Sequence, residues 1–139
     1  MKVLLDTNVA LDGTIRQGRF TIAAEALFDQ IVEEEIEGYL TSNCIADIFY
    51  IVNRLEGVRR ARETLSFLFS IISILPVSDT DCYLAFGSEL QDFEDALLLT
   101  CAERTGIDVI VTGDLELLRQ SSPVTLLSPE QFLTRHNGA

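Results

Sequence analysis

The chain has 139 residues, 47% of them hydrophobic, which predicts one domain with a hydrophobic core spanning residues 1–139. It carries 22 Asp and Glu against 10 Lys and Arg, a formal net charge of −12. This excess excludes nucleic-acid binding through a broad basic face, because phosphate contacts are made mainly by Lys and Arg, but it leaves open a nuclease whose carboxylates hold cations.

The first part of the chain alternates between strand-like and helix-like segments. In chain order we expect a strand, a helix, a second strand, two helices and a third strand, over residues 2–6, 21–38, 39–42, 44–57, 58–73 and 74–77. The strand at 2–6 ends in Asp6 and leads into a short helical stretch at 9–11. Gly38 is expected to end the first long helix, whose apolar residues follow a helical period.

The second part of the chain continues the alternation. We expect two helices, a strand, a helical turn, a fifth strand and a final helix, over residues 78–90, 92–106, 108–114, 115–120, 124–127 and from 128 onward. Ser78 and Asp81 form a cap-like pattern, and Ser128-Pro129-Glu130-Gln131 predicts a capping box. The whole pattern predicts an α/β fold, a three-layer α/β/α sandwich around a central, mainly parallel five-stranded sheet.

Several kinds of catalytic site are excluded by residues that the chain lacks. Lys2 is the only lysine and His136 the only histidine, so a lysine-dependent phosphate site and a Ser-His-Asp triad are both excluded. Cys44, Cys82 and Cys101 form no C-x-x-C pair and are expected to be reduced core residues. Without an apolar run of about 20 residues or a signal peptide, we expect a cytoplasmic protein with no membrane partner.

Carboxylates therefore have to carry any chemistry, and four stand out by their context: Asp6, Asp47, Asp95 and Asp114. Asp6 and Asp114 each follow a predicted strand, where open α/β folds place their ligands. A purely structural interpretation is also available, since Asp6, Asp92 and Asp114 can cap helices, and Asp95 can complement a helix dipole. Taken singly, these residues do not separate the two interpretations.

Asp47 does not fit the structural interpretation. It lies in the middle of a predicted helix, within the apolar stretch CIADIFYIV, and a carboxylate buried there without a partner would cost several kcal/mol. Arg54 lies two turns away, and a bound cation would also solve the problem. Carboxylate-only ligation suits Mg²⁺ or Mn²⁺ rather than zinc.

Four stretches in a fixed order carry a family resemblance: LLDTNVALD, IADIFYIV, FEDALLLTCAERTGIDVIVTGD and SPEQFL. Together they span nearly the whole chain, and the pattern resembles the PIN-domain nucleases, including the VapC-like toxins of prokaryotic toxin–antitoxin pairs. The resemblance implies a parallel sheet with acids at its carboxyl edge. It also implies Mg²⁺- or Mn²⁺-dependent hydrolysis of RNA that leaves a 5′-phosphate and a 3′-hydroxyl.

By position, the resemblance assigns the catalytic and metal-binding acids to Asp6, Asp47, Asp95 and Asp114, with Asn8 and Thr112 as small polar residues near them. The second acid of the family is commonly Glu, so the shorter Asp47 is expected to reach a metal only through water. Asp92 and Glu94 flank Asp95, and the apolar periodicity of this helix does not separate the three.

The resemblance also implies partners. We expect a homodimer, for which Phe67, Leu68, Phe69 and Tyr83 offer apolar surface, and a basic antitoxin whose arginine enters the acidic site. Arg54, Arg59, Arg60 and Arg62 either hold the RNA backbone or form a solvated helix face. The rival functions are a metal-poor scaffold for binding protein or RNA and a flap-type DNA nuclease, although the chain lacks the extra helical segments of the latter.

Overall fold

The computed structural model describes residues 1–15 and 18–137 and contains a five-stranded sheet in which all four strand pairs are parallel. The strands are β1 Lys2–Leu5, β2 Glu37–Thr41, β3 Ile72–Leu75, β4 Val109–Val111 and β5 Thr125–Leu127. Their order across the sheet is β3-β2-β1-β4-β5, so β1 is central and β4 is its neighbour. The predicted α/β fold with a mainly parallel five-stranded sheet is confirmed.

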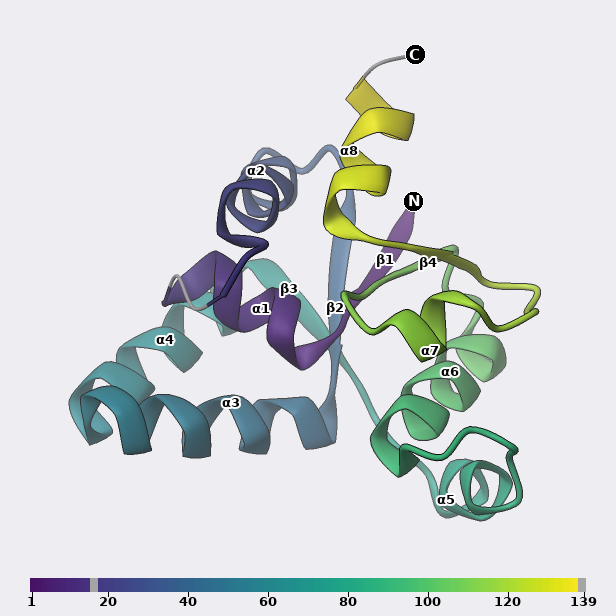
Figure 1. Cartoon of the computed structure of the whole chain (residues 1–139). Coiled ribbons are helices and arrows are strands. Elements are labelled where there is room, and N and C mark those ends of the chain that lie inside the picture. The colour runs from purple at the N-terminus through teal and green to yellow at the C-terminus, as the bar shows by residue number, and fades with distance from the viewer. Residues whose placement is uncertain (16–17, 138–139) are drawn as a thin grey trace.

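Helices connect successive strands and lie on both sides of the sheet (Figure 1). They are α1 Thr7–Thr14, α2 Thr21–Val32, α3 Ser42–Glu56, α4 Val58–Ile71, α5 Asp79–Phe86, α6 Phe93–Thr105, α7 Leu115–Leu118 and α8 Pro129–Asn137. Parallel strands need such crossovers, because the chain has to return to the same end of the sheet before the next strand begins.

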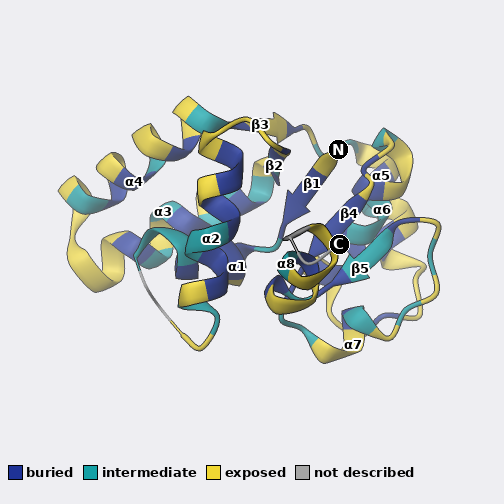
Figure 2. Ribbon diagram, turned by 90° about the horizontal axis from the view of Figure 1, so that it is seen from above, coloured by how far each residue is buried: buried dark blue, intermediate teal, exposed yellow. Residues whose placement is uncertain are grey.

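The sheet separates two hydrophobic cores, and β1 contributes to both. Val3 and Leu5 pack with residues of α1, α2, α3, α4 and α8, whereas Leu4 packs with residues of α5, α6 and α7. Successive side chains of a strand point to opposite faces, so a strand buried on both faces is apolar throughout. The interior strands and the sheet-facing sides of the helices are accordingly buried (Figure 2).

Several predicted element boundaries differ from the structure: among them, the helix predicted over 78–90 ends at Phe86 and the strand predicted over 108–114 ends at Val111. The helix predicted to run to Gly38 ends at Val32, and Gly38 lies inside β2, opposite Val3 of β1. A Cβ at Gly38 would lie 2.7 Å from Ile31, so this position takes glycine because α2 passes close to the strand, not because a helix ends there. The third strand is at Ile72–Leu75, two residues earlier than predicted.

The predicted caps are confirmed. Ser78 and Asp81 form a capping box at α5, Ser128 and Gln131 exchange the same pair of hydrogen bonds at α8, and Gly106 ends α6 in the left-handed region. The three cysteines are free thiols, two of them buried, whereas Cys82 is half-buried.

The prediction of an apolar surface for a dimer is wrong for one of its four residues. Leu68 is 0% exposed and belongs to the core, because it lies on the face of α4 that packs toward the sheet. Phe67, Phe69 and Tyr83 are exposed as expected. Within residues 1–15 and 18–137, no helix is both long and apolar enough to cross a membrane.

Candidate active site

The site begins where two adjacent parallel strands end together. Leu5 of β1 pairs with Val111 of β4, so Asp6 and Thr112 follow at the same edge of the sheet. The Asp6 amide donates to the Val111 carbonyl at 3.0 Å. The Thr112 hydroxyl donates to Asp6 Oδ2 at 2.7 Å and accepts from the Asp114 amide at 3.0 Å. The fully buried Thr112 thereby links the two acids that follow the strands.

A hollow of about 590 Å³ opens at this edge. Its described lining includes six acids: Asp6, Asp47, Asp92, Glu94, Asp95 and Asp114. The structure thus brings together the four acids predicted from the sequence and adds the two that flank Asp95. Asn8 also lines the hollow, whereas Thr112 is not part of the lining and acts on it through Asp6.

Three of these acids also cap helices. Asp6 Oδ1 accepts from the Thr7 amide at 2.7 Å, Asp92 Oδ1 from the Asp95 amide at 3.0 Å, and Asp114 Oδ1 from the Leu117 amide at 2.9 Å. The interpretation that Asp6, Asp92 and Asp114 cap helices is therefore correct. It does not exclude a role in the site, because a carboxylate has two oxygens and several lone pairs.

Asp95 is the most confined acid of the hollow. It is 7% exposed, and its buried Oδ2 has no hydrogen-bond partner among the residues that the structure describes. The pKa of Asp95 is raised to about 7, mainly by burial and in addition by the nearby carboxylates of Asp6, Asp114 and Asp92. By contrast, Asp92 is an exposed cap and Glu94 is also exposed, so burial now separates the three residues that periodicity could not.

Asp47 and Glu94 meet across the hollow from α3 and α6. Partial burial raises the pKa of Glu94, and a hydrogen bond between its protonated carboxyl and Asp47 adds to the rise. The expectation that Asp47 is enclosed by apolar residues is wrong: Asp47 is half-buried and its neighbours Ala46 and Tyr50 are exposed. Ile48 of this stretch is buried on another face of α3, whereas Tyr50 and Ile51 line the hollow together with Asp47.

Opposing effects also act on the pKa of Asp6, which lines the same hollow. Burial raises its pKa, and the carboxylates of Asp114 and Asp92 add to the rise. Hydrogen bonds from Thr112 and from the Thr7 amide oppose it. Both donors stabilise the charged form, so the protein holds an anion here while its surroundings disfavour the negative charge.

The donor set of this hollow fits a hard divalent cation. All the candidate ligands are carboxylates, and the unpartnered Asp95 Oδ2 is a buried acceptor that a cation would satisfy. Among residues 1–15 and 18–137, no three His, Cys, Asp or Glu side chains already converge on one metal position. Mg²⁺ commonly binds through one or two carboxylates and keeps several waters, so a convergent triad is not required.

Some residues of the site were not predicted from the sequence. Arg19, Phe20 and Tyr50 line the same hollow as the acids. Gly113 lies beneath Phe20, and a Cβ on it would lie 2.3 Å from the Phe20 ring. A glycine between Thr112 and Asp114 was a usable signal of close packing at the strand end. Arg19 carried no comparable signal, because it comes from a turn far from the acids in sequence.

Comparison with known families gives one match that spans most of the chain. The sequence pattern of the PIN domain matches residues 2–116, which include all six acids of the hollow. No curated protein matches the chain in sequence.

Comparison with solved structures gives similar folds at low sequence identity. VapBC2 from Rickettsia felis, bound to a DNA fragment from its promoter, matches with a TM-score of 0.68 and 14% identity, covering 91% of this chain and 97% of that chain. VapC20 from Mycobacterium tuberculosis, a Sarcin-Ricin loop cleaving toxin, matches with a TM-score of 0.68 and 13% identity, covering 83% and 92%. PAE2754 from Pyrobaculum aerophilum matches with a TM-score of 0.66 and 22% identity, covering 100% and 91%. At these identities the matches show the fold alone.

Proposed function

Because the chain belongs to the PIN domain family, we propose that it is an Mg²⁺- or Mn²⁺-dependent ribonuclease of the toxin type, which hydrolyses phosphodiester bonds of RNA. The observation that carries the proposal is the unpartnered, buried Oδ2 of Asp95 within a hollow lined by five further acids. Such an arrangement is unfavourable for folding and becomes favourable when a cation binds. The similar structure of VapC20, a Sarcin-Ricin loop cleaving toxin, supports RNA as the substrate.

In this proposal Asp6, Asp95 and Asp114 hold the cation, and Asp47 completes the set, directly or through water. A cation held there would supply a Lewis acid for water activation and for the charge that builds on the phosphate oxygens. The Thr112 hydroxyl keeps the Asp6 carboxylate oriented toward the hollow. Asp95, whose pKa is raised to about 7, would have to be deprotonated to hold the cation, because ligands bind a metal in their deprotonated form.

A metal-dependent cleavage assay tests the proposal. The purified chain is incubated with single-stranded RNA, with duplex DNA and with flap DNA, in EDTA and then in Mg²⁺ or Mn²⁺. We expect cleavage of the single-stranded RNA with metal only, and products that carry 5′-phosphates. Asp95→Asn should reduce the rate by roughly 100-fold or more, since a removed ligand weakens charge stabilisation in the transition state.

Asp29→Asn is the matched control, because it removes one acid from an exposed position on α2 outside the hollow. Its cleavage rate should equal that of the wild-type chain. Cleavage of flap DNA in preference to RNA would support the DNA nuclease instead. If no nucleic acid is cleaved with either metal, the chain is a scaffold that binds protein or RNA, and the ribonuclease proposal is wrong.

A toxin-type ribonuclease also implies partners, which we propose on the same basis. VapBC complexes among the similar structures pair a toxin with an antitoxin, and an acidic hollow suits a basic antitoxin segment. Exposed Phe67 and Phe69 on α4 and Tyr83 on α5 support a homodimer. Light scattering tests the dimer: a mass near 15.5 kDa, that of one chain, at micromolar concentrations would contradict it.

A further inference from the structure

The acidic hollow continues into a second hollow with a different lining. This second hollow has a volume of about 480 Å³ and shares Asn8, Arg19, Phe20 and Ile51 with the first. Beyond the shared residues its described lining includes Arg54 of α3 and the buried Asp12 of α1. We call it the arginine hollow, after Arg19 and Arg54. The two hollows thus form one surface depression, with six acids described at one end and, at the other, Arg19 and Arg54 beside the buried Asp12.

The arginines of this region fall into two classes by their partners. Arg59 forms an ion pair with Glu63 at 3.3 Å, and Arg60 forms ion pairs with Glu56 and Glu63. These two lie on α4 and balance charges of their own helical surface.

Arg19 and Arg54 are held differently. The Arg19 guanidinium lies 4.7 Å from the centre of the Phe20 ring, and the Arg54 guanidinium lies 5.7 Å from the centre of the Tyr50 ring. Within the described part of the chain, neither forms an ion pair with a carboxylate. An aromatic ring orients a guanidinium without occupying its hydrogen-bond donors, so both arginines keep their donors for an anion.

We propose that the arginine hollow binds the backbone of single-stranded RNA next to the bond that is cut, with Arg19 and Arg54 on neighbouring phosphates and the Tyr50 ring under an unpaired base. The inference rests on the proposed ribonuclease function and adds residues that position the substrate. Acids without a counter-charge would repel an RNA strand, and the two arginines supply attraction directly beside them. Only an unpaired base exposes a face to a ring, so the 64% exposed Tyr50 favours a single strand over a duplex.

In this proposal the arginines of α4 do not contact the RNA backbone, although the sequence offered them as candidates. Of the four arginines proposed from the sequence as RNA contacts, Arg54 lines this depression, while Arg59 and Arg60 are engaged by glutamates. Arg62 lines a separate hollow with Phe49 and Phe69. The RNA track therefore runs past α3 and the turn before α2, and not along α4.

Binding measurements test the inference separately from catalysis. Fluorescein-labelled single-stranded RNA is titrated with the Asp95→Asn chain in Mg²⁺, and the dissociation constant is measured by anisotropy over a range of salt concentrations. Arg19→Ala and Arg54→Ala, each made in this background, should weaken binding and each lower the salt slope by about 0.7, the value for one phosphate contact on a single strand. Tyr50→Leu should weaken binding roughly tenfold at every salt concentration and leave the slope unchanged.

Arg59→Ala is the matched control, since it removes the same charge from a side chain that is 94% exposed and paired with Glu63. Its salt slope should equal that of the parent. In the active chain, Arg19→Ala and Arg54→Ala should raise KM and leave kcat within about threefold, because uniform binding affects KM alone.

The outcomes separate this inference from the proposed function. If the wild-type chain cleaves RNA but Arg19→Ala and Arg54→Ala behave like Arg59→Ala, the function stands and the inference is wrong. If the wild-type chain neither cleaves nor binds RNA, both are wrong. Equal or tighter binding of single-stranded DNA of the same sequence, or of duplex RNA, would overturn single-stranded RNA as the occupant.

Discussion

Asp81 and Asp95 occupy the same local position in two neighbouring helices, yet their surroundings are opposite. Each is the third residue of its helix, and each donates its amide to the side chain of the cap residue, Ser78 for Asp81 and Asp92 for Asp95. Both are buried on the same side of the sheet. Local structure therefore does not explain the difference between them.

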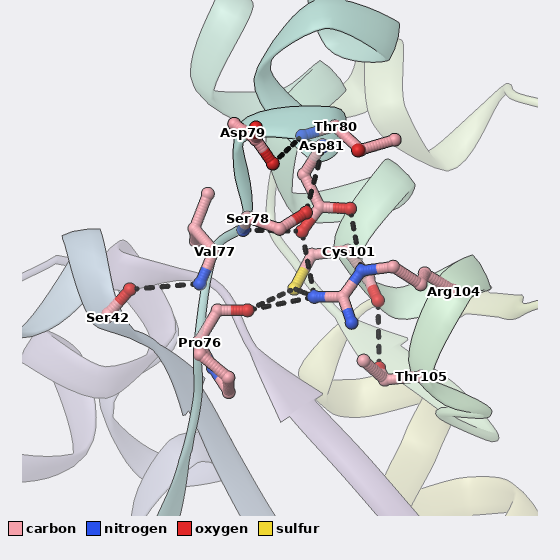
Figure 3. A network of polar contacts seen from close by, with 10 residues as sticks. All are labelled: Ser42, Pro76, Val77, Ser78, Asp79, Thr80, Asp81, Cys101, Arg104 and Thr105. Atoms are coloured by element: carbon pink, nitrogen blue, oxygen red, sulfur yellow. Dashed lines mark hydrogen bonds and ion pairs between the residues drawn. The ribbon is translucent and has the colours of Figure 1, made fainter.

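The difference lies in what meets the carboxylate. Arg104 donates to both oxygens of Asp81 at 2.8 Å, through Nε and Nη2, and the Ser78 amide adds a further hydrogen bond at 2.9 Å (Figure 3). The hydrogen bonds from Arg104 lower the pKa of Asp81 to about 2. The described charged groups that shift Asp95 are other carboxylates, and with burial they raise its pKa to about 7.

Helix α6 takes part in both arrangements, which makes the contrast informative. Its first turn supplies Asp95 to the acidic hollow, and its last turn supplies Arg104 to Asp81. The fold thus provides an arginine for a carboxylate that only holds structure together. Among the described residues no arginine forms an ion pair with the carboxylates at the sheet edge, although Arg19 lines the same hollow, and this is the arrangement expected where an exchangeable cation balances the acids.

The largest expected change in stability comes from removing the charge of Asp81, which is paired with Arg104. Asp81→Asn should destabilise the folded chain by about 2–3 kcal/mol, since it breaks a bidentate, charge-assisted contact within a buried network. Denaturant unfolding at neutral pH measures the change as a shift in the midpoint. Asp79→Asn, an exposed acid in the same first turn, is the control and should change stability by less than about 0.5 kcal/mol. A midpoint for Asp81→Asn equal to that of the control would contradict the comparison.

Features of the fold and of the acidic hollow were predictable from the sequence where they depend on residues close together in the chain. Features that depend on how separate elements pack were not. Asp6 and Asp114 were predicted because each follows a strand, and parallel strands deliver their ends to one edge. The cap at Ser78 was predicted because it depends on neighbours three residues apart. The pairing of Asp81 with Arg104 was not, because it joins two helices across 23 positions of sequence.

The misjudged features share a cause. Asp47 was taken to be enclosed because its sequence neighbours are apolar, but the exposed Tyr50 shows that an apolar residue does not have to be buried. Helix α2 was extended too far because Ile36 continues its apolar period, although Ile36 is buried in the turn before β2. Composition along the chain does not show which side of an element faces the core.

The next largest effect is stabilisation by metal. A cation that binds only the folded state stabilises it by about 2.7 kcal/mol at 100 times its dissociation constant. Mg²⁺ or Mn²⁺ should therefore raise the melting temperature of the wild-type chain and of Asp81→Asn by the same increment. The increment should be much smaller for Asp95→Asn, which lacks a ligand. An equal increment in Asp95→Asn, measured by calorimetry in EDTA and in metal, would mean that the cation binds elsewhere.

A smaller effect of opposite sign is expected when the unpaired charge is removed. In EDTA, Asp95→Asn should stabilise the chain by about 1 kcal/mol at neutral pH, because it removes a buried charge that neighbouring carboxylates repel. Asp92→Asn should gain less, since Asp92 is exposed and Asn caps a helix about as well as Asp. Chemical denaturation of the three chains in EDTA gives the ranking. If Asp92→Asn stabilises the chain more than Asp95→Asn does, the repulsion between carboxylates is centred on the helix cap Asp92 and not on Asp95.

The two carboxylates should also give a pair of pH slopes, each at most about 1.4 kcal/mol per pH unit for one proton. The folded pKa of Asp81, about 2, lies below its ordinary 3.8, so its contribution is present above pH 4 and is lost as the pH falls toward 2. The folded pKa of Asp95, about 7, lies above 3.8, so its contribution is present below pH 4 and is lost as the pH rises through 7.

Each substitution should therefore flatten a different part of the stability profile. In EDTA, Asp95→Asn should reduce the decline in unfolding free energy between pH 4 and 7, because Asn has no proton to lose in that range, while Asp6 and Glu94, whose pKa values are also raised, keep their share of the decline. Asp81→Asn should remove part of the decline below pH 4 and leave the neutral range parallel to that of the wild-type chain. Unfolding free energies from denaturant titrations at a series of pH values measure both. If both variants flattened the same range, the two carboxylates would share one environment, contrary to the opposite surroundings described above.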